Sequence, residues 1–492
     1  MMESIPDWLY VKRNSPAIAV EFEGVAWSYQ TLFEKATALA GRLQRIGEVG
    51  VGDRVAVIAR HGLVFTVVMH ALMQANAILV PINTRLAVKE VVWQLRNAGV
   101  KLMIADASHE EFASRISATL RDEGITVPLL TMAGDEEGNN DVPVYRTRVE
   151  LENVHAIVYT SGTTGFPKGA MITYGNHFWG ATGSAFRLGL STEDRWLIPM
   201  PLFHVGGLAV LMRSLIYGTT VEIHEQFDAQ KVMASLRTKK VTLLSVVAVM
   251  LQRMLAMDDE TFPQGVRAVL LGGGPAPRVL LDECIKRNVP ALFSYGLTES
   301  NSQAATLTIK DSLRKIGSAG QPLLMNEVKI VEDGREQPVY SAGEILLRGP
   351  TVVKGYYHRP DATADAFQGG WLHTGDIGYL DEEGYLYVLD RRQDLIISGG
   401  ENVYPAEIEA VLQEHEHVLE AGVAGMQDDE FGQAPFAVVC VEAGSSLDED
   451  ELKAFCASRL AKYKVPKAIR FAEGLPRNAA GKLLRRELLK WL

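Results

Sequence analysis

Cysteine is rare in this sequence, and the three residues present exclude a role built on clustered thiols. Cys284, Cys440 and Cys456 are far apart, and none belongs to a CxxC pair. A disulfide framework or a zinc site is therefore not expected, and a reducing cytoplasm fits the composition.

The chain also lacks an excess of positive charge. Its formal net charge is −11 at pH 7 and its pI is about 5.6. A sequence-independent grip on nucleic acid or on anionic lipid is not expected from this balance. Small molecules are the expected partners, and the question of a homo-oligomer stays open.

Long apolar runs are missing too. The strongest apolar window, VTLLSVVAVMLQRML from Val241, is interrupted by Thr242, Ser245, Gln252 and Arg253. It is shorter than a membrane span. The N-terminal stretch MMESIPDWLYVKRN has acids near its start and no apolar segment typical of a secretion signal. We therefore expect a cytoplasmic protein without stable membrane insertion.

Strand and helix patterns alternate along most of the chain and predict an α/β fold. Short β-branched runs, such as RVAVIAR (54–60), AILVPI (77–82), HAIVYTS (155–161) and TVEIHE (220–225), alternate with longer helical patterns. We expect a large N-terminal domain of layered α/β sheets over 1–390, with a β-rich subdomain over about 320–390. A small, mobile α+β domain is expected over 391–492.

A Gly- and Thr-rich stretch, YTSGTTGFPKGA from Tyr159, is a candidate phosphate-binding loop. Its glycines permit turns that a Cβ would obstruct, and Lys168 adds a compact positive charge. The Walker motif G-x-x-x-x-G-K-[ST] is not met, because Pro167 replaces its second glycine and Gly169 follows the lysine. Taken alone, the stretch could equally be a solvated flexible loop. The groups that could converge on phosphate oxygens are Thr160, Ser161, Gly162, Thr163 and Thr164.

Five further motifs follow this loop in order. They are LLGGGPAP (270–277), SYGLTES (294–300), WLHTGDIG (371–378), DRRQDLIISGGENVYPAEIE (390–409) and PRNAAGKLLRREL (476–488). With them the chain resembles, nearly end to end, the adenylate-forming superfamily of acyl-CoA synthetases, peptide-synthetase adenylation domains and luciferases. The resemblance implies an acid-thiol ligase that uses ATP, Mg2+ and CoA and forms AMP and pyrophosphate.

The resemblance also implies a nucleotide site. Tyr295 would offer a face to adenine, Asp376 would accept hydrogen bonds from both ribose hydroxyls, and Arg391 would reach the same ribose. Glu299 is the expected Mg2+ ligand, because Mg2+ prefers carboxylates alongside phosphate oxygens. Outside the phosphate loop, the implied nucleotide-binding residues are Gly272, Gly273, Gly274, Pro275, Tyr295, Gly296, Thr298, Asp376, Arg391 and Lys482.

In this superfamily the substrate carboxylate attacks the α-phosphorus of ATP. The acyl-adenylate and pyrophosphate are formed, and charge develops on oxygens around phosphorus, so cations are needed rather than a covalent residue. Lys482 is expected to bridge the carboxylate and the α-phosphate, with Thr298 and Glu299 as further catalytic residues. Lys168 would then assist the departure of pyrophosphate.

Each of these residues also has an ordinary structural explanation. A tyrosine is often core, an isolated glutamate is usually solvated, and Asp376 could belong to a turn. Arg391 could form a surface ion pair, and Lys482 could lie on the polar face of the last helix. The functional interpretation depends on the motifs occurring together and in order.

A domain rotation is implied for the second half-reaction. Lys482 would leave the site, and Ser398, Gly399 and Gly400 would face the adenylate and open a tunnel for the pantetheine thiol. The hinge departs from the commonest pattern, since Asp390 precedes the arginine and Gln393 lies two residues after it. Gln393 is the candidate hinge residue.

The acyl-substrate region contains two polar residues in an apolar stretch, MPLFHVGGLAVLMRSLIYGTT. A core or gate role for His204 is favoured over a general base, because a carboxylate needs no deprotonation at neutral pH. Arg213 lies on an apolar helical face and should seek a carboxylate partner. The region resembles the CoA ligases that act on 2-succinylbenzoate, an aromatic keto-diacid of menaquinone biosynthesis. The succinyl carboxylate would be adenylated, leaving the ring carboxylate for Arg213, with Ser302 lining the site.

The sequence leaves alternative functions open. A fatty-acyl or aryl-carboxylate CoA ligase of the same superfamily is the main one. A peptide-synthetase adenylation domain is not favoured because the chain ends at Leu492, soon after Lys482. No feature indicates a luciferin. A protein that only senses nucleotide would be expected to have lost Glu299, Asp376 or Lys482.

Overall fold

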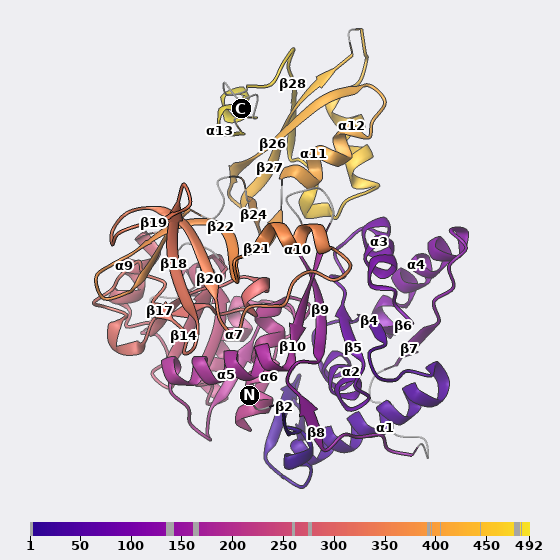
Figure 1. Ribbon diagram of the computed structural model, residues 1–492, viewed down its shortest axis with the longest axis vertical. Coiled ribbons are helices and arrows are strands. Elements are labelled where there is room, and N and C mark those ends of the chain that lie inside the picture. Colours follow the sequence, from indigo (N-terminus) through magenta and orange to yellow (C-terminus); the bar gives the residue numbers. More distant parts are fainter. Residues whose placement is uncertain are drawn as a thin grey trace.

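The structure is a computed structural model of the chain (Figure 1). It describes residues 3–133, 142–160, 167–257, 261–273, 278–390, 394, 396–403, 405–442, 444–476, 483 and 485–492. Within these ranges, strands and helices alternate in layers, and the predicted α/β fold class is confirmed.

The first sheet has six strands in the order β10-β9-β5-β4-β6-β7. All neighbouring pairs are parallel except β9 and β10, which are antiparallel. The strands are β4 (Arg54–Ile58), β5 (Ile78–Pro81), β6 (Leu102–Asp106), β7 (Leu129–Met132), β9 (Val154–Thr160) and β10 (Lys168–Thr173). The helices in this part of the chain are α1 (Tyr29–Gly47), α2 (Leu63–Gln74), α3 (Val88–Ala98) and α4 (Glu110–Asp122).

The second sheet has nine strands in the order β17-β16-β15-β14-β13-β11-β12-β2-β3, and its central strands are parallel. Its strands are β2 (Ile18–Phe22), β3 (Val25–Ser28), β11 (Arg195–Ile198), β12 (Thr220–Ile223), β13 (Leu243–Val247), β14 (Ala268–Gly272), β15 (Ala291–Tyr295), β16 (Ala305–Thr306) and β17 (Gln321–Pro322). The helices of this part are α5 (Tyr174–Leu188), α6 (Val205–Tyr217), α7 (Ala229–Thr238), α8 (Ala248–Leu255) and α9 (Arg278–Lys286). A two-stranded pairing of β1 (Ser4–Pro6) with β8 (Arg148–Glu150) lies beside them.

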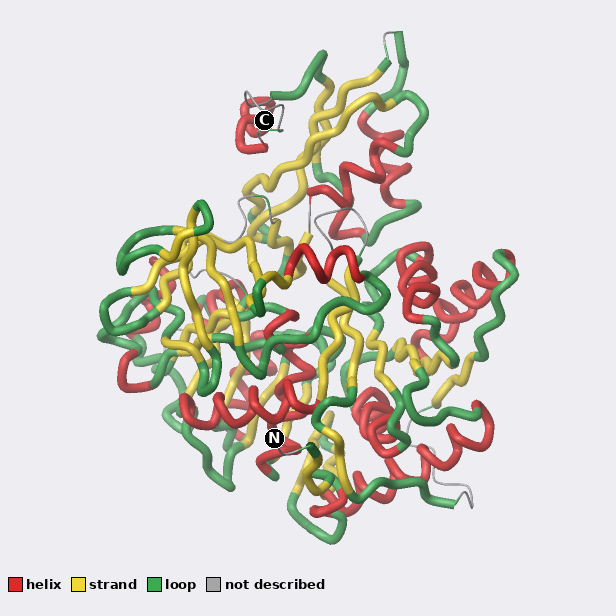
Figure 2. The backbone as a smooth tube through the Cα atoms, in the orientation of Figure 1, coloured by secondary structure: helices red, strands yellow, loops and turns green. Residues whose placement is uncertain are grey.

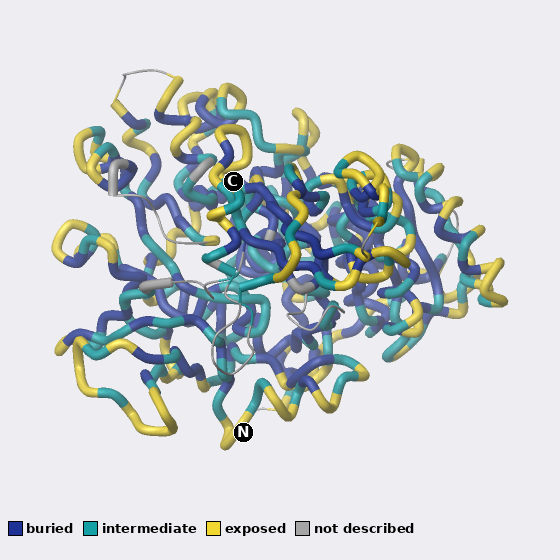
Figure 3. Tube along the Cα trace, turned by 90° about the horizontal axis from the view of Figure 1, so that it is seen from above, coloured by how far each residue is buried: buried dark blue, intermediate teal, exposed yellow. Residues whose placement is uncertain are grey.

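Burial explains why these strands are so apolar. Figure 3 shows buried segments running through the middle of the molecule and exposed segments in the peripheral loops. The side chains of Val55, Val57, Leu79, Ile104 and Leu292 have almost no exposed surface. Parallel strands covered by helices on both faces need such continuous apolar runs rather than alternating ones.

The third sheet is antiparallel and forms the β-rich part of the chain. Its strands are β18 (Glu327–Glu332), β19 (Arg335–Glu336), β20 (Gly343–Arg348), β21 (Phe367–Gln368), β22 (Trp371–Leu380) and β23 (Leu386–Asp390). Helix α10 (Pro360–Ala366) precedes β21.

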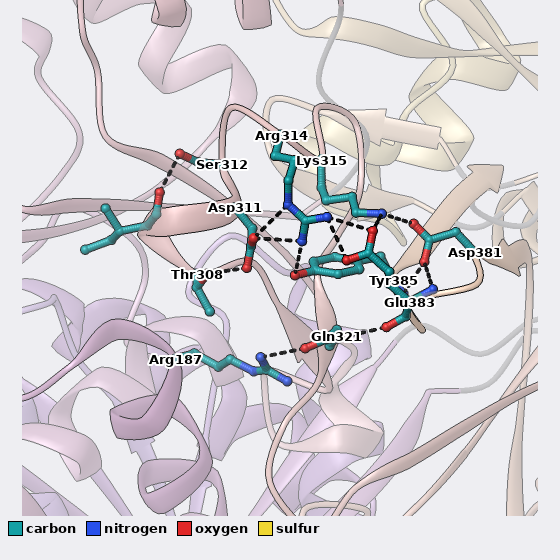
Figure 4. Close-up of polar contacts among 11 residues, drawn as sticks. Arg187, Thr308, Asp311, Ser312, Arg314, Lys315, Gln321, Asp381, Glu383 and Tyr385 are labelled. Carbon is teal, nitrogen blue, oxygen red and sulfur yellow. Dashed lines mark hydrogen bonds and ion pairs between the residues drawn. The ribbon is translucent and has the colours of Figure 1, made fainter.

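A cluster of ion pairs fastens this sheet to the segment before it. Lys315 Nζ lies 2.7 Å from an Asp381 carboxylate oxygen, and Arg314 Nη1 lies 2.7 Å from Glu383 (Figure 4). Asp381 is buried and also accepts hydrogen bonds from the backbone N–H groups of Glu383 and Tyr385. The turn between β22 and β23 is thereby held against the segment that connects β16 to β17 of the nine-stranded sheet.

The last part of the chain folds around a sheet of its own. Its strands are β24 (Ile396–Ser398), β25 (Glu401–Val403), β26 (Val418–Asp428), β27 (Gly432–Val441) and β28 (Ala468–Phe471). Its helices are α11 (Pro405–Gln413), α12 (Glu449–Ala457) and α13 (Arg485–Leu488). Figures 1 and 2 show these elements stacked above the larger part, with the β24 end of the sheet directed toward it.

The window VTLLSVVAVMLQRML does not form one element. Its first half is strand β13 and its second half is helix α8. Across the described ranges, no helix combines the length and hydropathy that a membrane crossing requires.

Candidate active site

A cavity of about 530 Å³ lies where the six-stranded sheet, the nine-stranded sheet, the β-rich sheet and the C-terminal part meet. The nine-stranded sheet contributes the ends of β13, β14 and β15, including Val247, Gly272 and Ser294. The β-rich sheet contributes Asp376, and the C-terminal part contributes Gly400. In open α/β sheets, ligands bind in crevices at the carboxyl ends of parallel strands, and this cavity occupies such a place.

The turn after β15 is shaped by one glycine. A Cβ on Gly296 would lie 1.6 Å from the carbonyl oxygen of Ser302, so no other residue fits without movement of the backbone. Ser302 has a positive φ of 85°, which is uncommon for a residue with a side chain. The turn carries Thr298, Glu299 and Ser302 into the cavity wall.

Asp376 is held in a defined orientation at the cavity wall. Its carboxylate accepts a hydrogen bond of 2.7 Å from the Tyr295 hydroxyl, and the side chain is almost completely buried. Tyr295 packs in a core cluster with Leu372 and Leu386 and is not among the described residues that line the cavity. In this conformation Tyr295 therefore orients the carboxylate, and its stacking on adenine stays a prediction.

A cation and a carboxylate flank the ring of Tyr356. Lys168 Nζ lies 5.3 Å from the ring centroid, and the hydroxyl donates a 2.7 Å hydrogen bond to Glu299. All three line the cavity. The Thr160 hydroxyl lies 3.5 Å from the carbonyl oxygen of Lys168.

The donor set around Glu299 fits Mg2+ that is bound mainly through phosphates. No group of three or more His, Cys, Asp or Glu in the described parts of the chain could hold a metal by itself. Mg2+ commonly takes one or two carboxylates and leaves its other positions to phosphate oxygens and water. Glu299 beside Lys168 offers such a position.

Arg213 is a buried cation that opens onto the cavity. Its side chain is almost completely buried on α6, and Nη1 and Nη2 have no hydrogen-bond partner among the described residues. The guanidinium lies 5.7 Å from the ring centroid of Trp196, whose indole N–H donates to the Ser245 hydroxyl. Burial lowers the pKa of Arg213 to about 10, so it stays charged at pH 7. An unpaired buried cation requires an anionic partner, and the cavity is where one can enter.

The hairpin of β24 and β25 covers the cavity from the C-terminal side. Its turn residues Gly399 and Gly400 have positive φ values of 58° and 85° and line the cavity, whereas Ser398 is buried in the strand. A Cβ on Gly400 would lie 3.8 Å from the side chain of Val247. The hairpin turn therefore lies directly over the end of β13.

Glu401 joins this hairpin to the larger part. Its carboxylate lies 2.8 Å from His204 Nε2 and 2.5 Å from Arg85 Nη1. Burial would raise the pKa of Glu401, but His204 and Arg85 lower it overall, so the carboxylate is ionised. His204 is thus held by an acid from the C-terminal part, and its role as a gate stays a prediction.

Several predicted site residues lie outside the described residues. These are Ser161, Gly162, Thr163, Thr164, Gly274, Pro275, Arg391, Gln393 and Lys482. Of the remainder, Thr160, Lys168, Gly272, Gly273, Gly296, Thr298, Glu299, Asp376, His204, Arg213, Ser302, Gly399 and Gly400 line one cavity.

Comparison with known proteins places the chain in a family. The family model described as AMP-binding enzyme matches residues 8–357, and the model of the AMP-binding enzyme C-terminal domain matches residues 407–482. A 2-succinylbenzoate-CoA ligase of Geobacillus kaustophilus is 48% identical over 99% of this chain and 98% of its own. One from Bacillus cereus (strain Q1) is 45% identical over the same shares.

The chain belongs to the 2-succinylbenzoate-CoA ligase family of AMP-binding enzymes.

Two solved structures of the family member from Bacillus subtilis indicate which conformation this chain adopts. Each is 40% identical to it, and each comparison covers 99% of this chain and at least 98% of the other. A double mutant bound to the product analogue OSB-NCoA gives a TM-score of 0.92, whereas the complex with the acyl-adenylate OSB-AMP gives 0.75. Because identity and coverage are nearly the same in the two comparisons, the difference in TM-score indicates that the two solved structures differ in how their parts are arranged. This chain has the arrangement of the product-analogue complex.

Three residues of the site were not predicted from the sequence. Arg85, Tyr356 and Glu401 contact predicted site residues, but each contact joins segments far apart in the sequence. Glu401 lies in the motif DRRQDLIISGGENVYPAEIE, directly after Gly400, so its place in that motif is the sequence feature that could have identified it. Arg85 and Tyr356 lie outside the six motifs.

Proposed function

We propose that this protein is an ATP-dependent ligase that joins 2-succinylbenzoate to CoA, in menaquinone biosynthesis. The succinyl carboxylate is adenylated first, and the acyl group is then transferred to the CoA thiol. The fatty-acyl or aryl-carboxylate alternative is not favoured. The observation that carries the substrate assignment is the unpaired guanidinium of Arg213 at the cavity wall.

The first half-reaction needs a nucleotide held with its α-phosphorus accessible. Asp376, oriented by Tyr295, accepts hydrogen bonds from the ribose hydroxyls, and Thr298 donates to the α-phosphate. Lys168 and the 160–164 loop hold the β- and γ-phosphates. Mg2+, when bound, neutralises charge on the phosphate oxygens, and Glu299 holds it. The α-phosphorus gains a bond to the carboxylate oxygen and loses its bond to the oxygen of the leaving pyrophosphate.

Lys482 completes this step by bridging the attacking carboxylate and the α-phosphate. Because Lys482 belongs to the C-terminal domain, we infer that a second domain arrangement brings it to the cavity. We propose that the boundary lies at 390–391, with Arg391 on the ribose and Gln393 at the hinge, and that the enzyme works in the cytoplasm.

Arg213 selects the diacid. Its guanidinium pairs with the ring carboxylate, directly or through water, and Ser302 lines the same site. Because the cation is already desolvated in the free enzyme, only the desolvation of the carboxylate opposes the pairing. The keto-acid chain then extends toward the nucleotide.

The second half-reaction uses the arrangement of the present structure. Gly399 and Gly400 leave room for a pantetheine chain because they carry no side chains, and Glu401 draws His204 toward the hairpin. The thiol attacks the acyl carbon, a thioester bond forms, and AMP leaves.

A pyrophosphate-release screen tests the substrate assignment. Purified enzyme with ATP and Mg2+ would be offered 2-succinylbenzoate, benzoate and octanoate separately. We expect release with 2-succinylbenzoate to exceed the other two by at least about 100-fold, because only it satisfies Arg213. Equal or faster release with octanoate or benzoate would overturn the assignment in favour of the general ligase.

A further inference from the structure

A buried ionic cluster joins helix α3 to the C-terminal domain at the edge of the substrate cavity, where Lys464 belongs to the cavity lining. Lys464, in the 3-10 turn Lys462–Lys464, lies 2.7 Å from Glu90 on α3 and 2.7 Å from Glu407 on α11. The exposed fractions of the three side chains are 4%, 9% and 6%. Ion pairs this deeply buried are costly to break, because the remaining charge keeps its desolvation penalty.

The surroundings of the cluster seal it from water. Ala461 packs in one core cluster with Val91 and Val92 of α3, and Tyr463 packs against the same cluster. The Tyr463 hydroxyl accepts a 3.2 Å hydrogen bond from Asn83. The 461–464 segment therefore docks on α3 through apolar, polar and ionic contacts together.

The two carboxylates of the cluster play different parts. Glu407 and Lys464 belong to the same domain, so their pair can persist when that domain rotates. Glu90 belongs to the larger domain, and its bond to Lys464 is the arm of the cluster that crosses the interface. In this structure the bond accompanies the arrangement in which Gly399 and Gly400 line the cavity.

The side chain of Glu90 is also held by the backbone of its own helix. Its second carboxylate oxygen accepts a 2.8 Å hydrogen bond from the backbone N–H of Ala87, at the first turn of α3. One oxygen thus caps the helix while the other faces Lys464, which leaves the side chain little freedom. A charged group held in this way is preorganised for docking.

We propose that Glu90 is a positioning residue for thioester formation. Acting through Lys464, it holds the C-terminal domain in the thioester-forming arrangement. Among the described residues Glu90 does not line the cavity, so it does not touch substrate, whereas Lys464 does line it. This proposal depends on the proposed ligase function.

The variant Glu90→Gln separates the two tasks of the side chain. A glutamine can still cap α3, because Gln serves in capping boxes as Glu does, but it cannot pair with the Lys464 ammonium. The matched control is Glu111→Gln, which removes the same charge from an exposed position on α4. Two rates would be measured on each preparation: pyrophosphate release without CoA, and thioester formation from preformed acyl-adenylate after CoA is added.

The ratio of thioester rate to pyrophosphate rate decides the outcome, since it does not depend on the folded fraction. We expect this ratio to fall at least tenfold in Glu90→Gln and to stay within twofold of the wild type in Glu111→Gln. An unchanged ratio, or equal loss of both rates, would overturn the role of Glu90. Absence of any thioester from wild-type enzyme would instead contradict the ligase function itself.

Discussion

At the scale of single residues, the arrangement around Arg213 carries the most information. A desolvated guanidinium without an acid is destabilising unless a ligand completes it. The sequence stretch around Arg213 is apolar and contains no Asp or Glu, so the sequence itself indicates that the partner of Arg213 is a carboxylate of the substrate. The aromatic support from Trp196 could not be predicted, because β11 and α6 meet only in the fold.

Replacement of Arg213 by leucine should separate substrate binding from nucleotide binding. Loss of a charge-assisted contact of about 2 to 4 kcal/mol should raise the KM for 2-succinylbenzoate roughly 30- to 1,000-fold. The KM for ATP should change less than about threefold. Steady-state kinetics with each substrate varied in turn measures both.

An analogue provides the control for this variant. 4-Oxo-4-phenylbutanoate has the same chain and ring but no ring carboxylate, so it should be used about equally by Arg213→Leu and the wild type. A variant that still prefers 2-succinylbenzoate by the wild-type ratio would show that Arg213 does not bind the ring carboxylate.

At the scale of elements, most strands of the two large sheets follow from the sequence. The β-branched runs at 54–60, 77–82 and 220–225 contain β4, β5 and β12, and the run at 155–161 overlaps β9 except for its first residue, Val154. The run from Val241 was harder to interpret, because a buried strand and a buried helix show the same continuous apolarity. In the structure, the pairing of β13 with β11 and β14 shows that the first half of this run is a strand.

The turn at Gly296 is the element on which the site depends most. Gly296→Ala would place a Cβ on the Ser302 carbonyl, and the required backbone shift should cost more than about 3 kcal/mol. We expect a lower apparent melting temperature and a loss of pyrophosphate release of at least tenfold, because Thr298 and Glu299 move with the turn. Thermal unfolding and the pyrophosphate assay check both.

Gly50→Ala is the comparison for this substitution. A Cβ at Gly50 meets no atom within 4 Å, and its φ is not positive, so stability should be unchanged or slightly raised. Equal effects of the two substitutions would mean that the close approach to Ser302 is not what requires a glycine at position 296.

At the scale of the whole molecule, the arrangement of the domains determines which half-reaction the cavity supports. The motifs predict that Lys482 serves adenylate formation and that Ser398–Gly400 serve thioester formation, but they do not predict which domain arrangement the structure adopts. Long-range contacts decide this, notably Glu401 with His204 and Lys464 with Glu90. Such contacts join residues about 200 to 400 positions apart. They cannot be predicted from the sequence, because nothing in it distinguishes these charged residues from others on the surface.

Fixing the hinge should stop the enzyme between its two steps. Gln393 lies outside the described residues, and Gln393→Pro would restrict its φ. We expect adenylate formation within about threefold of the wild type and thioester formation reduced at least tenfold. Rapid-quench measurement of each half-reaction checks this, and equal loss of both would argue against rotation at this residue.

In the proposed reaction, one cavity joins 2-succinylbenzoate to CoA and cleaves ATP to AMP and pyrophosphate. Mass spectrometry of the products formed from ATP, Mg2+, CoA and 2-succinylbenzoate, with benzoate and octanoate present as competitors, tests it most directly. We expect the mono-CoA thioester of 2-succinylbenzoate, with AMP and pyrophosphate in equal amounts. Benzoyl-CoA or octanoyl-CoA as the main product, or release of ADP, would contradict it.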